Sequence, residues 1–121
     1  MDILNRLAES IAYIEKHLDQ PLKHEEIAKI AYSSKFHYQR MFYMLTGVTL
    51  ADYIRKRRLT VAAQELAASH IKVVDAALKY RYNTLDSFSK AFSRLHGISP
   101  LQAREKAGRS GHFHVYPFIF K

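Results

Sequence analysis

Two segments of the chain, residues 34–47 and 84–97, place side chains that can bind nucleic acid at matching positions. In the first segment, Gln39 has an amide that suits adenine, and Arg40 has a guanidinium that suits guanine or a phosphate. In the second segment, Lys90 stands at the position of Arg40. The two segments therefore predict two equivalent binding elements in one small protein.

The remaining residues of the two segments predict the elements that hold these side chains. Each segment begins with a hydroxyl residue and ends with a glycine, which are common first and last residues of a helix. Between these ends, large apolar residues recur at steps of four and three, and this spacing places them on one helix face. The matching pairs are Ser34/Thr84, Tyr38/Phe88, Phe42/Phe92, Leu45/Leu95 and Gly47/Gly97.

The composition favours a folded domain with a polyanionic partner. The 121 residues suffice for one domain or two very small ones, and 48% of them are hydrophobic. The 19 Lys and Arg residues exceed the 11 Asp and Glu residues and leave a net charge of +8. This excess favours nucleic acid first and an anionic membrane surface second.

Several classes of chemistry have no support in the sequence. The absence of cysteine excludes disulfides, thiolate catalysis and cysteine-ligated zinc. We find no glycine-rich phosphate loop, nucleophile elbow or recognisable carboxylate pair, so we expect no enzyme and no cofactor. The pair His112 and His114 has no accompanying acidic residue, and we expect no metal site. No signal peptide or membrane span is visible, which favours a soluble cytoplasmic protein.

The rest of the chain reads as further helices, separated by short connections. We expect an all-α fold of about seven helices, with no convincing strand before residue 110. Two short helix–turn–helix units are joined by one long central helix. The expected helices lie near residues 3–18, 25–31, 35–46, 49–69, 73–80, 85–96 and 100–108.

These elements predict a division of the chain into subdomains. We assign residues 1–48 to the first helix–turn–helix subdomain, 49–69 to the linker helix and 70–108 to the second subdomain. The tail, residues 109–121, is glycine-led, aromatic and alternating, like the beginning of a β-strand. It is either the beginning of a further C-terminal domain or a segment that packs back on the helices.

Between Ile3 and Arg104, the sequence resembles the DNA-binding domain of the AraC family of bacterial transcription regulators. Each matching stretch alone is weak evidence, but their order along the chain is highly specific. The stretches are Phe36–Phe42, Thr46–Gly47, Asp52–Leu59 with Ala62 and Leu66, Phe88–Arg94, Gly97–Pro100 and Arg104.

The resemblance implies two helix–turn–helix subdomains that bind double-stranded promoter DNA as one unit. A helix over 49–69 is about 30 Å long, close to the ~34 Å of one turn of B-DNA. The second helix of each unit can then enter successive major grooves, and a monomer can read both. The family further implies an activator that contacts RNA polymerase, at the nucleoid of a bacterial cytoplasm.

The resemblance also implies which side chains touch DNA. On the first recognition helix we expect Tyr38, Met41, Phe42 and Leu45 to face inward, and we expect His37, beside these aromatic residues, to be a packed or capping histidine. We expect base contacts from Lys35, Phe36, Gln39, Arg40, Asp86, Ser87 and Lys90. We expect phosphate contacts from Ser34, Tyr43, Arg55, Arg58, Thr84, Ser89 and Arg94. The second helix is poorer in donors, so the first unit should dominate specificity and the second mainly add affinity.

The chain departs from the family pattern at Tyr32 and Arg81, where many members have glycine between the two helices of a unit. If these positions require positive φ, each side chain costs on the order of 1 kcal/mol. Two other interpretations stay open. The chain can be the DNA-binding part of a larger regulator whose C-terminal domain binds a small-molecule effector, or a basic helical protein-interaction module.

Overall fold

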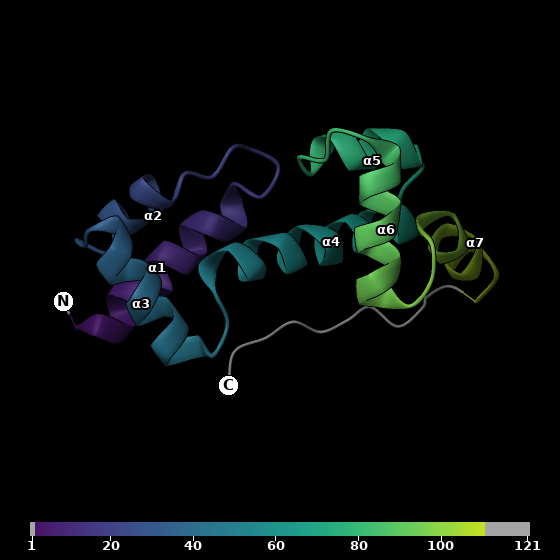
Figure 1. Ribbon diagram of the computed structural model, residues 1–121. Helices are drawn as coiled ribbons and strands as arrows, with labels where there is room; N and C mark the ends of the chain where they lie inside the picture. Colours follow the sequence, from purple (N-terminus) through teal and green to yellow (C-terminus); the bar gives the residue numbers. More distant parts are fainter. Residues whose placement is uncertain (1, 111–121) are drawn as a thin grey trace. The chain divides into compact units, whose positions relative to one another are not determined.

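The computed structural model describes residues 2–110, which form seven α-helices and no strand (Figure 1). This confirms the all-α prediction for the described residues. None of these helices is long and apolar enough to cross a membrane. The predicted strand-like tail, residues 109–121, lies outside the described residues except for its first two, which are helical and belong to the last helix. The helices are α1 (Ile3–Lys16), α2 (His24–Ile30), α3 (Lys35–Thr46), α4 (Leu50–Ala68), α5 (Val73–Lys79), α6 (Leu85–His96) and α7 (Pro100–Ser110).

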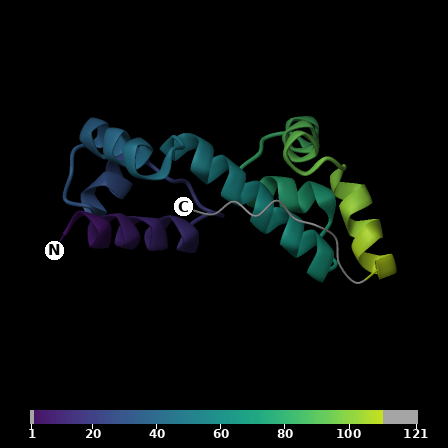
Figure 2. The ribbon, with the colours of Figure 1, turned by 90° about the horizontal axis from the view of Figure 1, so that it is seen from below.

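The described chain forms two compact units whose boundary falls inside α4, between Arg55 and Lys56. Figures 1 and 2 show α4 as one continuous ribbon. The first unit therefore contains α1, α2, α3 and the first turns of α4. The second unit contains the remainder of α4 with α5, α6 and α7.

In the first unit, α1 packs on α2 and α2 packs on α3. Tyr38 and Phe42 of α3 are fully buried, and Phe42 meets Tyr53 of α4 edge-on, with ring centroids 5.6 Å apart. The buried hydroxyl of Ser10 donates to the carbonyl of Leu7, so the hydroxyl of Tyr38, 2.7 Å away, donates to Ser10. This hydrogen bond satisfies a polar group inside the core and ties α3 to α1.

In the second unit, α6 packs against α5 and α7. Phe88 and Phe92 of α6 are fully buried and occupy the positions that Tyr38 and Phe42 occupy in the first unit. They belong to a hydrophobic cluster that includes Leu59 and Leu66 of α4. Each unit thus holds its second short helix by one pair of buried aromatic residues.

The predicted ends of both recognition helices are confirmed. Ser34 accepts the backbone N–H of His37 at 3.3 Å, and Thr84 accepts that of Ser87 at 3.1 Å. Gly47 and Gly97 both adopt φ of 80°, a conformation that glycine tolerates without strain. The long helix and the last helix are capped in the same way: Thr49 accepts the backbone N–H of Asp52, and Ser99 accepts that of Gln102.

The turn inside each unit has the same backbone hydrogen bonds. The N–H groups of Tyr32 and Ser33 donate to Lys29 and Ala28, and those of Arg81 and Tyr82 donate to Leu78 and Ala77. This is the Schellman pattern, which requires a left-handed residue directly after the C-cap residue of the helix. Tyr32 and Arg81 occupy that position with φ of 55° and 74°. Many family members have glycine at these two positions, which suggests a positive φ there. This positive φ is present in both turns.

Replacement of Arg81 tests whether the second turn stores this backbone strain. Arg81→Gly is expected to have a free energy of unfolding about 0.5–1 kcal/mol higher than Arg81→Ala, because glycine adopts positive φ without a Cβ clash. Urea unfolding of both variants measures the difference, and the common loss of the arginine charge cancels. At the exposed helical position Gln64, the same alanine-to-glycine comparison should have the opposite sign. Equal signs at both positions would contradict the assignment of strain.

Candidate nucleic-acid interface

The outer face of α3 presents an aromatic and a basic side chain to solvent. Phe36 is 76% exposed, and Arg40, one turn later, is also exposed. Tyr43 lies exposed near the end of the helix, and Ser34 lies exposed at its first turn. Since Tyr38 and Phe42 anchor the opposite face, this surface is free to meet a ligand.

Two further side chains predicted to contact bases are held by neighbours in the first unit. Lys35 is half-buried, with its Nζ 3.7 Å from a carboxylate oxygen of Glu25 on α2. The same ammonium lies 4.9 Å from the centroid of the Phe36 ring. Lys35 therefore has an anionic partner and an aromatic partner within the unit, which restrict its position.

Gln39 is half-buried and contacts the first residue of α2. Its Nε2 lies 2.7 Å from Nδ1 of His24, whose ring is also half-buried. Burial is the main cause that lowers the pKa of His24, the charge of Lys35 lowers it further, and Glu25 acts in the opposite direction. The neutral ring is therefore favoured at pH 7. The amide of Gln39 thus has a fixed partner before any ligand arrives.

The outer face of α6 has a different arrangement of charge. Lys90 and Asp86 form an ion pair of 3.1 Å across one helical turn, and both side chains are about three-quarters exposed (74% and 77%). The hydroxyl of Ser87 donates to the carbonyl of Thr84 at 3.0 Å, which adds to the cap. An exposed pair of this kind contributes little stability and separates easily. In this unit the negative charge of Asp86 and the positive charge of Lys90 neutralise each other.

The other predicted phosphate contacts of the second helix differ in exposure. Arg94 is exposed in the last turn of α6, and Ser89 is half-buried. Thr84 is exposed, and its hydroxyl accepts the backbone N–H of Ser87 in the helix cap and donates to the Ser87 hydroxyl oxygen, 2.8 Å away.

The basic run of α4 does not form one continuous basic face. Arg55 is exposed and pairs with Asp52, one turn earlier on the same helix. The next three basic residues, 56–58, are half-buried and have interactions of their own. Burial, followed by the charge of Arg81, lowers the pKa of the Arg58 guanidinium, although arginine stays protonated at neutral pH.

Two predictions for α3 are wrong: that Leu45 faces inward, and that the side chain of His37 packs beside the core. Leu45 is 39% exposed, and together with Ile3, Met41 and Met44 it lines an open groove of about 220 Å³. Among the described residues that line this groove, Ile3 at the beginning of α1 is the one that lies outside α3. His37 is exposed and not packed beside the core, and its backbone N–H meets the cap at Ser34.

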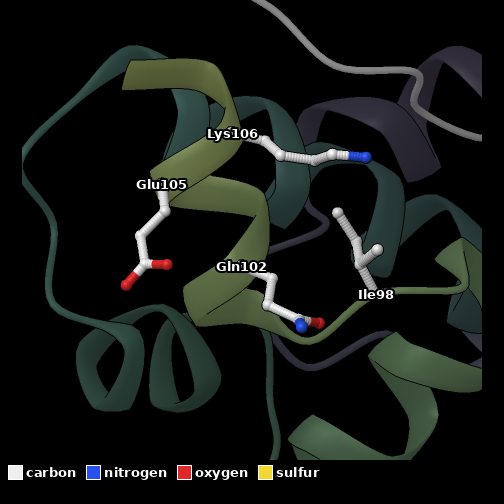
Figure 3. A pocket seen from close by; sticks show the side chains of 4 residues that line it. All are labelled: Ile98, Gln102, Glu105 and Lys106. Atoms are coloured by element: carbon white, nitrogen blue, oxygen red, sulfur yellow. The ribbon is translucent and has the colours of Figure 1, made fainter. Parts of the chain in front are cut away.

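A second hollow, of about 270 Å³, lies on α7 (Figure 3). Its lining residues are Ile98, Gln102, Glu105 and Lys106, and the last two extend to opposite sides of the helix. Gln102 accepts the backbone N–H of Ser99 at 2.9 Å and so completes the cap of α7. These residues lie outside α6 and do not extend its exposed face. Among the described residues, no group of three potential metal ligands lies together.

Sequence reasoning missed two residues that shape this surface, His24 and Glu25. Both lie on α2, and each contacts a predicted base reader on α3. From the sequence alone, Glu25 in the first turn of a helix predicts only a favourable interaction with the helix dipole. The short turn after α2 brings the two helices together, but it does not predict which polar side chains meet. The Asp52–Arg55 pair had a clearer signal, because residues three apart on a helix are neighbours.

Comparisons with known proteins agree with this geometry. A family model described as a helix-turn-helix domain matches residues 27–106. The chain is 39% identical over 94 residues to the HTH-type transcriptional activator AarP of Providencia stuartii, with 78% of this chain and 70% of AarP covered.

Solved structures show the same fold. A transcriptional regulator from Chromobacterium violaceum, described by its AraC-type DNA-binding domain, gives a TM-score of 0.83 at 23% identity, with 89% of this chain and 96% of that chain covered. The DNA-binding domain of AdpA, a global transcriptional factor solved with a target DNA, gives a TM-score of 0.79 at 27% identity. The match covers 89% of this chain and 98% of the AdpA domain.

The lowered pKa of His24 predicts a pH-dependent stability. The unfolded chain binds the proton more readily than the folded chain, so the free energy of unfolding should fall as pH drops below the ordinary histidine pKa of about 6.5. Urea unfolding between about pH 7.5 and 5.5 measures this slope. The slope should decrease more in His24→Leu than in His70→Leu, which removes an exposed histidine. Equal slopes in the two variants would contradict the assignment to His24.

Proposed function

The chain belongs to the AraC-type family of helix-turn-helix DNA-binding transcription regulators, and we propose that it binds promoter DNA as a monomer. In this proposal α3 and α6 each enter a major groove, and the two grooves are successive. The duplication supports the proposal most directly: one chain contains two 12-residue helices with matching caps, matching terminal glycines and matching buried aromatic pairs. Proteins with one such unit generally need a dimer to occupy two grooves.

The side chains of α3 support a role in base reading. Arg40 can donate two hydrogen bonds to guanine, Gln39 can pair with adenine, and Phe36 can pack on a thymine methyl. Lys35, held beside Phe36, adds a base contact at the first turn of the helix. Ser34 and Tyr43 flank this set and can donate hydroxyl protons to phosphates. We therefore assign most of the sequence specificity to the first unit.

The side chains of α6 support a smaller share of specificity. Lys90 has to separate from Asp86 before it can donate fully to a base, and Ser87 is engaged in the cap. Asp86 can accept from a cytosine amino group, but near phosphates its charge is unfavourable. Thr84, Ser89 and Arg94 supply phosphate contacts in this proposal. On α4, we assign phosphate contacts to Arg55 and Arg58.

The direction of regulation is also proposed. The relative AarP is named as a transcriptional activator, and we propose that this chain also activates transcription. An activator has to favour the binding or opening of the promoter by the transcribing enzyme, so RNA polymerase is the proposed protein partner. The proposed place of action is the bacterial cytoplasm, at the nucleoid.

A random-sequence DNA selection tests the function directly. With purified protein at about 150 mM salt, we expect enrichment of one motif of about two helical turns. Arg40→Ala should relax discrimination at one base-pair position of one half-site, at a cost of about 1–3 kcal/mol for the preferred base. Binding that collapses with salt and enriches no motif would contradict sequence-specific regulation.

The proposed division between base and phosphate contacts predicts a different effect for Arg94. Arg94→Ala should weaken binding to all sequences alike and reduce the slope of log K against log[salt] by about one. Fluorescence-anisotropy titrations at several salt concentrations measure both effects. Asp86→Ala is the matched change of opposite sign on the same helix, and it should strengthen binding to all sequences. Loss of discrimination at one base pair in Asp86→Ala would instead assign Asp86 to a cytosine.

A further inference from the structure

We propose that His24, which lies outside the recognition helix, sets the orientation of the Gln39 side-chain amide. This orientation determines which DNA base Gln39 prefers to bind. In this proposal His24 is a positioning residue, and its protonation changes base preference at one position of the DNA site. The inference rests on the proposed function, because it assigns a base contact to Gln39. The direct contact between Nδ1 of His24 and Nε2 of Gln39, at 2.7 Å, carries the proposal.

The contact is built into the packing of the first unit. His24 is the first residue of α2, and Gln39 lies in the second turn of α3. These two helices pack on each other and are joined by a turn whose backbone is fixed by the Schellman hydrogen bonds. Both side chains are half-buried, so neither ring nor amide is free to turn away into water without loss of packing.

Donor and acceptor roles follow from the atoms in contact. The amide nitrogen of Gln39 can only donate, so Nδ1 of His24 has to be the unprotonated acceptor. The ring is then neutral and carries its proton on Nε2. Gln39 keeps its carbonyl oxygen and its second N–H for a ligand. This acceptor and donor are the pair that adenine requires, at its N6 amino group and its N7.

Protonation of His24 reverses the roles at this contact. Both ring nitrogens then carry protons, so Nδ1 can only donate. The amide has to rotate by about 180° to bring its oxygen to Nδ1, because the two ends of an amide have nearly the same shape. Oxygen and nitrogen of Gln39 thereby exchange places. A DNA base whose edge matched the first orientation of the amide then faces the wrong groups. Its donor faces the amide N–H, and its acceptor faces the amide oxygen.

The surroundings of His24 favour its neutral ring at pH 7. Burial is the largest influence and lowers the pKa of the ring. Lys35, on the facing helix α3, also lowers it, whereas Glu25, next to His24 on α2, raises it. Glu25 and Lys35 are themselves paired, at 3.7 Å. The amide should therefore reverse only when pH falls below the ordinary histidine pKa of about 6.5.

The central experiment compares base preferences at two pH values. The affinity of wild type is measured by competition for the selected duplex and its single base-pair variants, at about pH 7.5 and 5.5. At the Gln39 position, preference for the selected base should fall by roughly fivefold or more at the lower pH, the smaller end of the range for a good bidentate base contact. In His24→Leu the preference at this position should be weaker at the higher pH and should not change with pH.

His37→Gln is the matched control, because it removes a histidine from the recognition helix itself and leaves the His24–Gln39 contact intact. It should retain the pH dependence at the Gln39 position. Imidazole nitrogen NMR of the full chain provides a readout that does not depend on DNA. We expect the Nε2-protonated tautomer of His24 in wild type, and the chemical shift of its unprotonated Nδ1 should change in Gln39→Leu, where the hydrogen bond from the amide is absent.

The outcomes separate this inference from the proposed function. Sequence-independent binding by wild type at both pH values would contradict the proposed function, and the inference with it. Sequence-specific binding with the same preferences in wild type and His24→Leu would contradict the role of His24 alone. A His24 ring that carries its proton on Nδ1 at neutral pH would also contradict it, even if His24→Leu binds DNA differently.

Discussion

Each unit depends on one pair of aromatic residues, four positions apart, that fix a short helix to the core. A 12-residue helix is marginal in water by itself, so its stability comes mainly from the buried face. Tyr38 with Phe42, and Phe88 with Phe92, lie on that face and are fully buried. Because these pairs provide the anchoring, the opposite face of each helix does not have to contribute to folding. Its residues can then serve the binding of a ligand.

The two units share this constraint but differ in how their outer faces are supported. In the first unit, neighbours on α2 hold Lys35 and Gln39, and the Tyr38 hydroxyl is bonded to Ser10 on α1. In the second unit, phenylalanine replaces that tyrosine, and the exposed charges of α6 pair along their own helix. A side chain held by its neighbours loses less conformational freedom on binding than a free one. This difference is the physical reason to expect more discrimination from the first unit.

Much of the fold could be predicted from the sequence because local interactions define it. Hydroxyl caps, terminal glycines and the four-residue spacing of aromatics each act within a turn or two of helix. The errors arose where the result depends on the distance to another element: Leu45 is 39% exposed, and His37 faces solvent. The contact of His24 with Gln39 joins residues 15 apart and depends on how α2 and α3 pack. The periodicity of one helix contains no information on such a pairing.

We propose that one chain reads DNA with two helices of unequal discrimination. The most direct test is the stoichiometry of the complex on its selected duplex, by native mass spectrometry, together with the affinity for every single base-pair substitution in that duplex. We expect one chain per duplex and two clusters of sensitive base pairs, about one helical turn apart, with larger effects in the cluster assigned to α3. Two chains per duplex, or a single cluster of sensitive base pairs, would contradict it.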